Sequence, residues 1–178
     1  MKGRVFAGVL IICMAIGSIA GCAMHHSQMM KTDKGDNIAV DKLKNDADFY
    51  DHRLIKVVLE RNKESGFYGL QATYMNEIAF VALVSGIDFP DNSEISLVFF
   101  NFSEARGIIL PGEKMWSATM LKTPIAKITG NWLYCSIDYQ TLKPKFSDPI
   151  SVCYTGCHKA KENNDYVFLE HPLRDNKK

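Results

Sequence analysis

The sequence carries almost no excess charge of either sign. Its 178 residues contain 21 lysines and arginines and 20 aspartates and glutamates, a formal net charge of +1 at pH 7. Proteins that bind nucleic acid usually carry a basic stripe or block, and none stands out here. Internal repeats and low-complexity segments are missing as well. We therefore expect no nucleic-acid partner, and the length suits one domain once the two ends are trimmed.

A long apolar run is missing too. The run at the N-terminus extends from Val5 to Ile16, whereas a membrane-spanning helix needs about 20 apolar residues. Lys2 and Arg4 precede this run and small residues follow it, which is the order of a secretory signal peptide. Residues 19–22, IAGC, resemble the lipobox of bacterial lipoproteins, in which the cysteine is acylated and becomes the mature N-terminus. An ordinary signal peptide or a single membrane helix is the alternative.

The lipobox resemblance implies that residues 1–21 form a lipoprotein signal peptide and that Cys22 carries the lipid. Several acyl chains on one cysteine, at roughly 0.8 kcal/mol per buried methylene, form a stable membrane anchor. Ala23 stands where a signal for retention in the inner membrane usually has aspartate, so the resemblance favours the outer membrane, with the protein facing the periplasm. Residues 22–40 are polar without periodicity and are predicted to form a flexible tether to a domain at 41–178.

The rest of the chain has a pattern typical of strands. Stretches rich in valine, isoleucine and aromatic residues, several of them entered after a turn signal, predict β-strands. The five predicted strands are residues 54–62, 67–76, 94–102, 114–122 and 131–140. The apolar run 77–86 is ambiguous between helix and strand. With a short amphipathic helix in 41–53 and a helix around the paired cysteines, the sequence predicts an α+β domain with an antiparallel sheet.

Cysteine is scarce, and its placement is informative. The chain has five cysteines, and Cys135, Cys153 and Cys157 are the three that follow the predicted lipidation site. The last two begin and end the sequence CYTGC, which is followed directly by His158. A c-type haem attachment site normally reads Cys-x-x-Cys-His, with two residues between the thiols. Here residues 154–156 place three residues between them.

Covalent haem attachment requires two thiols that reach the porphyrin vinyl groups and an imidazole that reaches the iron from the same segment. Residues three or four apart lie on one face of a helix, so a pair spaced like Cys153 and Cys157 also meets the requirement. Gly156 permits a local bulge that would absorb the extra residue. Cys157 and His158 alone would hold haem through one thioether. The alternatives are a metal-free disulfide or a zinc site, although zinc usually takes four ligands and no second Cys/His pair exists.

The C-terminal part of the chain resembles the cytochrome P-460 family, which includes the cytochromes c′-beta. Those proteins carry Cys-x-x-Cys-His, a helix rich in lysine and alanine, a D-x-V-F sequence and then a proline. The matching residues here are 157–160, 165–168 and Pro172. Upstream, residues 130–139, GNWLYCSIDY, resemble the family's Gly-x-Trp strand before the haem segment, and residues 87–100 resemble its F-x-D-G-T-V strand.

The resemblance extends from about Tyr50 to Pro172. It implies a five-stranded antiparallel β-sheet with flanking helices, usually in a homodimer. It also implies one covalently attached haem c, with Cys153 and Cys157 as the attachment residues and His158 as the proximal ligand of the iron.

The sequence lacks the lysine that the P-460 enzymes bond to the haem macrocycle. Residues 64–113 contain no lysine, and the matching position falls on Leu97 or Val98. An apolar wall of this kind resembles the c′-beta branch, in which phenylalanines crowd the open face of a five-coordinate iron. We therefore predict that Leu97, Phe99 and Phe100 contact the haem, although the same residues would equally form an ordinary sheet core.

These observations predict a lipid-anchored monohaem c-type cytochrome of the cell envelope that binds nitric oxide or a similar small gaseous or nitrogenous ligand. An apolar pocket without hydrogen-bond donors favours uncharged diatomic ligands over anions. Three alternatives stay open. One is oxidation of hydroxylamine or nitric oxide, as in the P-460 enzymes, so the sequence leaves open whether the protein is an enzyme. Another is electron transfer to a periplasmic partner, with Met75, Met115 or Met120 as a sixth ligand. The third is a structural lipoprotein without haem.

Overall fold

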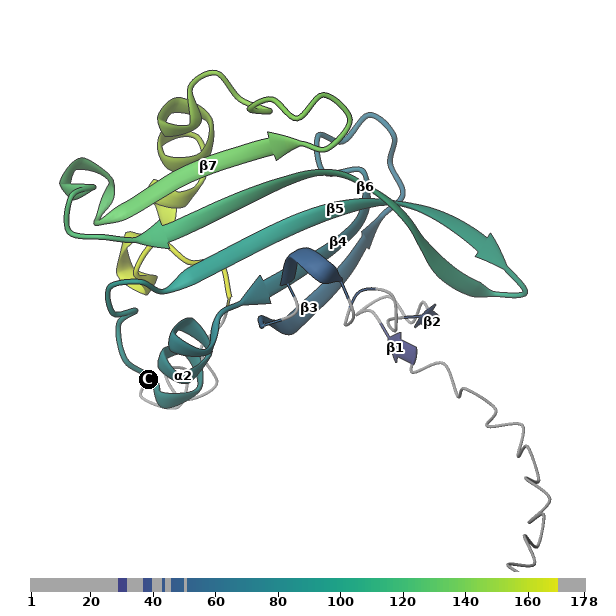
Figure 1. Ribbon diagram of the computed structural model, residues 1–178, viewed down its shortest axis with the longest axis horizontal. Helices are drawn as coiled ribbons and strands as arrows, with labels where there is room; N and C mark the ends of the chain where they lie inside the picture. Colours follow the sequence, from purple (N-terminus) through teal and green to yellow (C-terminus); the bar gives the residue numbers. More distant parts are fainter. Residues whose placement is uncertain (1–28, 32–36, 40–42, 44–45, 50, 170–178) are drawn as a thin grey trace, which may run out of the picture.

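The computed structural model of the chain describes residues 29–31, 37–39, 43, 46–49 and 51–169 (Figure 1). These residues form an α+β fold built on a twisted sheet with an antiparallel five-stranded body, which confirms the predicted fold class. The five main strands are β3 (Arg53–Glu60), β4 (Gly69–Met75), β5 (Glu94–Ala105), β6 (Ile108–Lys122) and β7 (Trp132–Asp138). Each of them overlaps one predicted strand.

The five strands pair in the order β3-β4-β5-β6-β7, each antiparallel to its neighbour. β5 and β6 form a long hairpin, whose turn places Arg106 at φ 53° and Gly107 at φ 73°. Two consecutive left-handed residues give a two-residue turn the twist that the flanking strands require. Along each strand, successive side chains face opposite sides of the sheet, so the sheet has two distinct faces.

Two short strands extend this sheet. β1 (Met29–Lys31) pairs with β2 (Asn37–Ala39), and β2 runs parallel to β6 with Ile38 opposite Ile109. Ile38 is fully buried, and the burial of its apolar side chain stabilises this pairing. Both strands lie within residues 22–40, for which the sequence predicts a flexible tether, so the fold includes part of that segment.

The apolar run 77–86 forms the helix α2 (Glu77–Ser85). The Asn76 side chain caps its start by accepting a hydrogen bond from the Ala79 N–H at 3.0 Å, and Gly86 ends it at φ 81°. A polar N-cap and a left-handed glycine are the usual ends of an α-helix. None of the helices among the described residues is long and apolar enough to cross a membrane, and the predicted signal peptide and Cys22 lie outside those residues.

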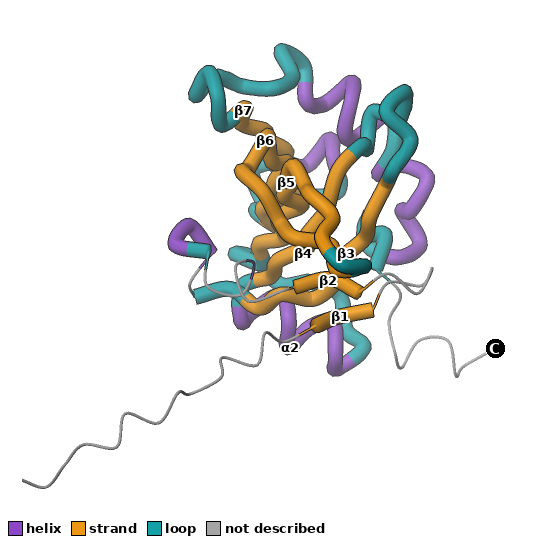
Figure 2. Tube along the Cα trace, turned by 90° about the vertical axis from the view of Figure 1, so that its right-hand side faces the viewer, coloured by secondary structure: helices purple, strands orange, loops and turns teal. Residues whose placement is uncertain are grey.

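The other helical segments are short. They are η1 (Ala47–Phe49), η2 (Lys127–Thr129), η3 (Ile150–Thr155) and η4 (His158–Asn164). η1 falls in the helix predicted within 41–53, of which residues 41–42, 44–45 and 50 lie outside the described residues. η3 and η4 confirm a helical segment around the paired cysteines. Figure 2 shows the sheet from the side, with the helical segments in purple around the strands in orange.

One face of the sheet packs into a closed core. Leu43 and Phe49 cover side chains from the strands, which are Ile38, Val57, Leu59, Leu70, Ala72, Tyr74, Val98, Phe100 and Ile109. The Tyr74 hydroxyl donates a hydrogen bond to the Leu43 carbonyl at 2.9 Å, and its ring stacks on Phe49. On the opposite, second face of the sheet, α2 and the C-terminal segment pack against strand residues that include Met120 and Trp132. This second face also borders a cavity.

Candidate functional site

A cavity of about 590 Å³ lies between the second face of the sheet and the segment that follows β7. Leu97 and Trp116 line it from the sheet, and Cys153, Cys157 and His158 line it from η3 and the start of η4. The fold therefore brings together four of the six residues that the sequence predicts to bind a cofactor. These four come from β5 and from a segment more than fifty residues later in the chain.

η3 is a π-helix, and it absorbs the third residue between the two thiols. The Gly156 N–H donates a hydrogen bond to the Ser151 carbonyl at 3.0 Å, which is the five-residue spacing of a π-helix. This turn carries one more residue than an α-helical turn. Cys153 lies within it and Cys157 lies just after it, and both line the cavity. The sequence analysis noted that Gly156 permits a bulge at this place.

Gly156 is required by close packing and not by unusual dihedral angles. Its φ of −72° and ψ of −26° are ordinary helical values. A Cβ added to Gly156 would lie 2.7 Å from the carbonyl oxygen of Val152 and 3.3 Å from that of Ser151. Any other residue at this position would therefore push apart the turn that spaces the cysteines.

The three described cysteines, Cys135, Cys153 and Cys157, are all free thiols, which gives no support to a disulfide. Burial raises the pKa of Cys153, and the neighbouring Cys157 and Cys135 raise it further, so this thiol is protonated at neutral pH. Across the described ranges, no three His, Cys, Asp or Glu side chains come together as metal ligands. A structural zinc site, which usually takes four such ligands, has no support there.

His158 lines the cavity with one ring nitrogen already engaged. Its Nδ1 lies 2.6 Å from the carbonyl oxygen of Tyr166, and because a carbonyl can only accept, Nδ1 carries the proton. The lone pair of Nε2 is then available to a metal, which is the arrangement typical of metal-ligating histidines. Burial lowers the pKa of His158, against an opposing effect of the Tyr166 hydrogen bond. The imidazole is therefore neutral at pH 7.

The sheet wall of the cavity is apolar along β5. Leu97 lines the cavity directly. Phe99 is fully buried and stacks on the lining residue Trp116, with ring centroids 3.7 Å apart, so it supports the wall from the same face. Phe100 lies in the closed core with Val98. The structure thus places Phe100 away from the cavity, in contrast to the prediction, because adjacent residues of a strand face opposite sides of the sheet.

Besides Thr119 on β6 and Tyr134 on β7, three polar side chains that the sequence analysis did not single out line the cavity. They are Lys56 on β3 and Gln71 and Thr73 on β4. The Gln71 Nε2 donates a hydrogen bond to the Phe67 carbonyl at 2.6 Å. Each of the three alternates with buried residues of its strand. That alternation was the sequence signal that could have placed them on the face opposite the closed core. The cavity therefore differs from the donor-free pocket that the sequence predicts.

The three methionines considered as a sixth iron ligand occupy different places. Met120 lines the cavity. Met75 is fully buried in the cluster beneath α2, and the methyl group of Met115 lies close to Gly69. Of the three, only Met120 has access to a group bound in the cavity.

The residues of the cavity fit a flat apolar group such as haem. Four apolar side chains at the cavity are 36–54% exposed, namely Val58, Phe67, Val152 and Phe168, and a planar group would cover them. The hydroxyl of Tyr134, a lining residue that is 6% exposed, has no hydrogen-bond partner among the described residues. Buried polar groups are normally paired. Two thiols, a neutral imidazole and an apolar body together are what a c-type haem requires.

The comparison with protein families agrees with this geometry. The chain matches the family model described as Cytochrome P460 over residues 46–169, a range that contains the five main strands, α2 and the whole segment with Cys153, Cys157 and His158. No curated protein matches the chain. Membership of this family implies a haem-binding protein, and the cavity offers the residues for that role. The chain belongs to the Cytochrome P460 family.

Proposed function

We propose that this protein is a monohaem c-type cytochrome in which His158 is the proximal ligand of the iron. The observation that carries this proposal is the state of His158, which lines an apolar cavity as a neutral imidazole with its Nδ1 bonded to the Tyr166 carbonyl at 2.6 Å. Only Nε2 is then free to bind a metal. When bound, haem would supply an iron that can take a small ligand.

We also propose that Cys153 and Cys157 both form thioethers with the haem. The support is the π-helical turn, which brings both thiols to the cavity despite the three residues between them. Replacing either cysteine by alanine should then remove one thioether and leave the other. The pyridine haemochrome band should shift to longer wavelength by similar amounts in Cys153→Ala and Cys157→Ala, because each variant regains one vinyl group, with Cys135→Ala as the control that changes nothing.

The proposed iron ligand is nitric oxide or another small uncharged molecule. Leu97 and Ala118 contribute apolar side chains to the sheet wall, and a charged ligand without partners in such surroundings is costly. The polar lining residues include Gln71, Thr73 and Lys56, and Lys56 lies on the edge strand β3, two strands away from Leu97. An uncharged diatomic molecule needs no counter-charge from the wall, so it fits this cavity better than an anion does.

The test is spectroscopic and uses the full chain produced with haem. A pyridine haemochrome spectrum should show a c-type haem, and the ferrous protein should bind nitric oxide. His158→Ala should keep covalently attached haem but change the spectrum of the ferrous iron, because the axial nitrogen is lost. A colourless product, or an unchanged ferrous spectrum in His158→Ala, would contradict the proposal.

One observation favours a second function, the oxidation of hydroxylamine or nitric oxide. β5 carries no lysine, but Lys56 reaches the same cavity from β3, and the P-460 enzymes that the chain resembles bond a lysine to the haem. The binding protein should have an ordinary high-spin c-type spectrum that is the same in the wild type and in Lys56→Met. A long-wavelength Soret band that Lys56→Met abolishes, together with turnover of hydroxylamine, would establish the enzyme instead.

We further propose that Cys22 anchors the protein by lipid to the outer membrane, facing the periplasm, and that the protein forms a homodimer. Both proposals rest on resemblance: the first on the lipobox and the second on the family.

Cys22→Ala should move the protein from the membrane fraction to the soluble fraction, and retention in the membrane would indicate an uncleaved helix. Light scattering of the mature domain should give twice the mass of one chain.

A further inference from the structure

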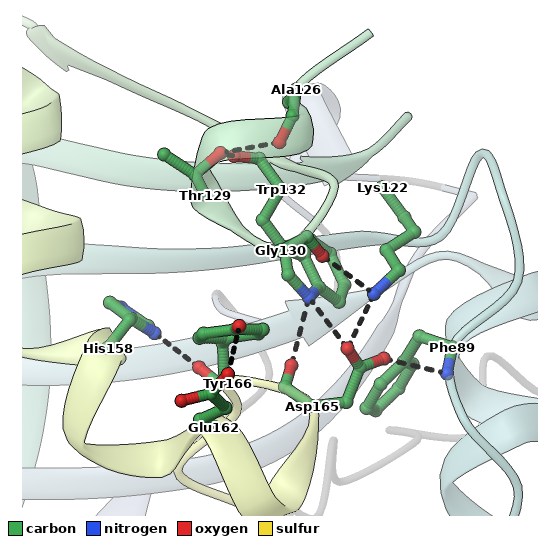
Figure 3. Close-up of polar contacts among 10 residues, drawn as sticks. All are labelled: Phe89, Lys122, Ala126, Thr129, Gly130, Trp132, His158, Glu162, Asp165 and Tyr166. Carbon is green, nitrogen blue, oxygen red and sulfur yellow. Dashed lines mark hydrogen bonds and ion pairs between the residues drawn. The ribbon is translucent and has the colours of Figure 1, made fainter. Parts of the chain in front are cut away.

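Two short sequences that resemble family motifs, Gly130-x-Trp132 and Asp165-Tyr166, meet in the structure (Figure 3). We infer that Lys122, Asp165 and Trp132 form a positioning device for His158, because they fix the turn whose carbonyl group holds the His158 Nδ1. This inference rests on the proposed function, in which His158 is the ligand of the iron. None of the three residues needs to touch the haem for the device to act.

Asp165 is held by its side chain and its backbone at once. Its Oδ1 lies 2.5 Å from Lys122 Nζ, its Oδ2 accepts a hydrogen bond from the Phe89 N–H at 3.0 Å, and its carbonyl accepts one from Trp132 Nε1 at 2.9 Å. Trp132 is fully buried, and the side chains of Lys122 and Asp165 are 10% and 11% exposed. Donors from three separate parts of the chain therefore fix this one residue.

The ammonium group of Lys122 is itself satisfied within the same cluster. It donates a hydrogen bond to the Gly130 carbonyl at 3.2 Å and lies 4.9 Å from the centre of the Trp132 ring. A well-packed apolar pair would often be as stable as a buried ion pair. Stability alone therefore does not explain these charges, whereas their directed hydrogen bonds specify one conformation of the turn.

The turn needs this support because its backbone is unfavourable. Asp165 and Tyr166 both adopt left-handed conformations, at φ 50° and φ 64°, and residues with a Cβ rarely do so. Such conformations persist where the surroundings determine them from several directions. Here they direct the Tyr166 carbonyl to His158 Nδ1, at 2.6 Å.

The ring of Tyr166 completes the device. It packs so closely on Gly130 that a Cβ added to Gly130 would overlap it, and its hydroxyl donates a hydrogen bond to Glu162 at 3.1 Å. Gly130 and Trp132 thus contact the two residues of the turn from one short segment at the start of β7. Lys122 is thus connected to the imidazole of His158 through its ion pair with Asp165 and through the carbonyl of the next residue, Tyr166.

The first experiment needs no haem. In the haem-free full chain, ¹⁵N NMR should show His158 mainly as the tautomer with the proton on Nδ1. In Trp132→Phe, which keeps an aromatic ring, smaller than the indole, but loses the Nε1 donor, and in Asp165→Asn, the second tautomer should become clearly populated. Tyr74→Phe is the matched control. It also removes one buried hydrogen bond, the one to the Leu43 carbonyl at 2.9 Å, but from the closed core on the opposite face of the sheet.

The second experiment uses the haem-loaded full chain. Trp132→Phe should shift the iron–histidine stretching band of the ferrous protein to lower frequency and raise the midpoint potential, since a weaker hydrogen bond at Nδ1 makes the imidazole a weaker donor. Tyr74→Phe should leave both values unchanged. A loss of thermal stability in Trp132→Phe equal to that in Tyr74→Phe, with an unchanged tautomer and unchanged band, would overturn the inference and leave a structural role.

The two proposals fail in different ways. If the wild type holds no haem, the proposed function is wrong, while the tautomer of His158 in the haem-free chain still tests the positioning device. If haem binds and His158→Ala alters its spectrum but Trp132→Phe and Asp165→Asn alter neither tautomer nor band, only the device is wrong. Asp165→Asn keeps the volume of the side chain, and Trp132→Phe retains the Lys122–Asp165 pair, so at least one of the two variants avoids a buried unpaired charge.

Discussion

The two faces of the sheet are completed in different ways. On one face the chain covers its own strands, and side chains such as Leu70, Tyr74 and Phe100 are at most 1% exposed. On the other face the same strands border a cavity of about 590 Å³, where Val58 and Phe67 stay 36% and 52% exposed. A sheet of alternating side chains offers both faces to burial, but the described residues close only one of the two completely.

The difference between the two faces separates the residues that stabilise the fold from the residues that contact what the cavity binds. Adjacent residues of β5 illustrate it, since Leu97 lines the cavity while Val98 is fully buried in the closed core. A substitution on the closed face should change stability in every state of the protein. A substitution on the open face should change mainly what the cavity holds.

The largest expected effect tests this contrast directly. Phe100→Ala should destabilise the protein by about 3–5 kcal/mol, the usual cost of deleting a buried phenylalanine, whether or not haem is present. Leu97→Ala should cost only about 1 kcal/mol in the haem-free chain, because its side chain is already partly exposed. Urea denaturation of both variants, with and without haem, gives these values.

Ligand kinetics separate the two residues further. Leu97→Ala should speed the binding of carbon monoxide to the ferrous protein, because the cavity wall becomes wider, and Phe100→Ala should not. Equal destabilisation by the two variants, or faster ligand binding in Phe100→Ala, would show that the two faces do not divide the roles in this way.

A smaller effect is expected at the turn between the cysteines. Gly156→Ala places a Cβ 2.7 Å from the Val152 carbonyl oxygen, and relieving such an overlap typically costs about 1–3 kcal/mol. The π-helical turn should open, so that mass spectrometry after thiol alkylation finds a larger fraction of haem-bearing chains in which Cys153 is alkylated and therefore forms no thioether. Gly66→Ala is the control, because nothing lies within 4 Å of a Cβ added there. An undiminished fraction of doubly attached haem in Gly156→Ala would mean that the turn does not set the spacing.

Much of the fold was predictable because it depends on local pattern. All five main strands were predicted, since each alternates or is rich in β-branched residues over several positions. α2 was ambiguous because both of its faces are apolar, as the exposed Ile78 and Val81 and the buried Ala79 and Ala82 show. β1 and β2 were missed because three residues are too few for a period, and their pairing depends on β6, some seventy residues away.

The site was predictable where a local motif or the family resemblance pointed to it, and Leu97 is an example of the latter. Cys153, Cys157 and His158 lie within six consecutive residues, so they were expected to meet. Lys56 and Gln71 reach the cavity only through the pairing of β3 with β4 and β5, which the sequence does not specify. The positioning of His158 by Trp132 likewise depends on a contact between segments 33 residues apart.

The smallest expected effect concerns pH in the haem-free chain. Burial lowers the pKa of His158 below its ordinary value of 6.5, so the unfolded chain binds this proton more readily than the folded chain. Above about pH 6.5 both states are neutral at this residue, and its effect on stability is absent. As the pH falls below 6.5 toward the lowered folded-state pKa, stability should be lost.

Denaturant midpoints of the wild type and of His158→Gln between pH 5 and pH 8 measure this effect. All other titrating groups are shared, so the wild type should lose more stability on acidification than the variant does. Parallel curves for the two proteins would show that His158 is not held neutral by burial.

The π-helical turn has a consequence for the way such proteins are found. A search pattern that fixes the number of residues between the two cysteines assumes that only one spacer length brings both thiols to the haem. The hydrogen bond from the Gly156 N–H to the Ser151 carbonyl shows how a longer spacer is accommodated. One inserted residue changes the pitch of a single turn and leaves the downstream Cys157-His158 pair at the cavity. The better signature is therefore geometric: a thiol pair and an imidazole on one wall of an apolar cavity, with the spacer length left free.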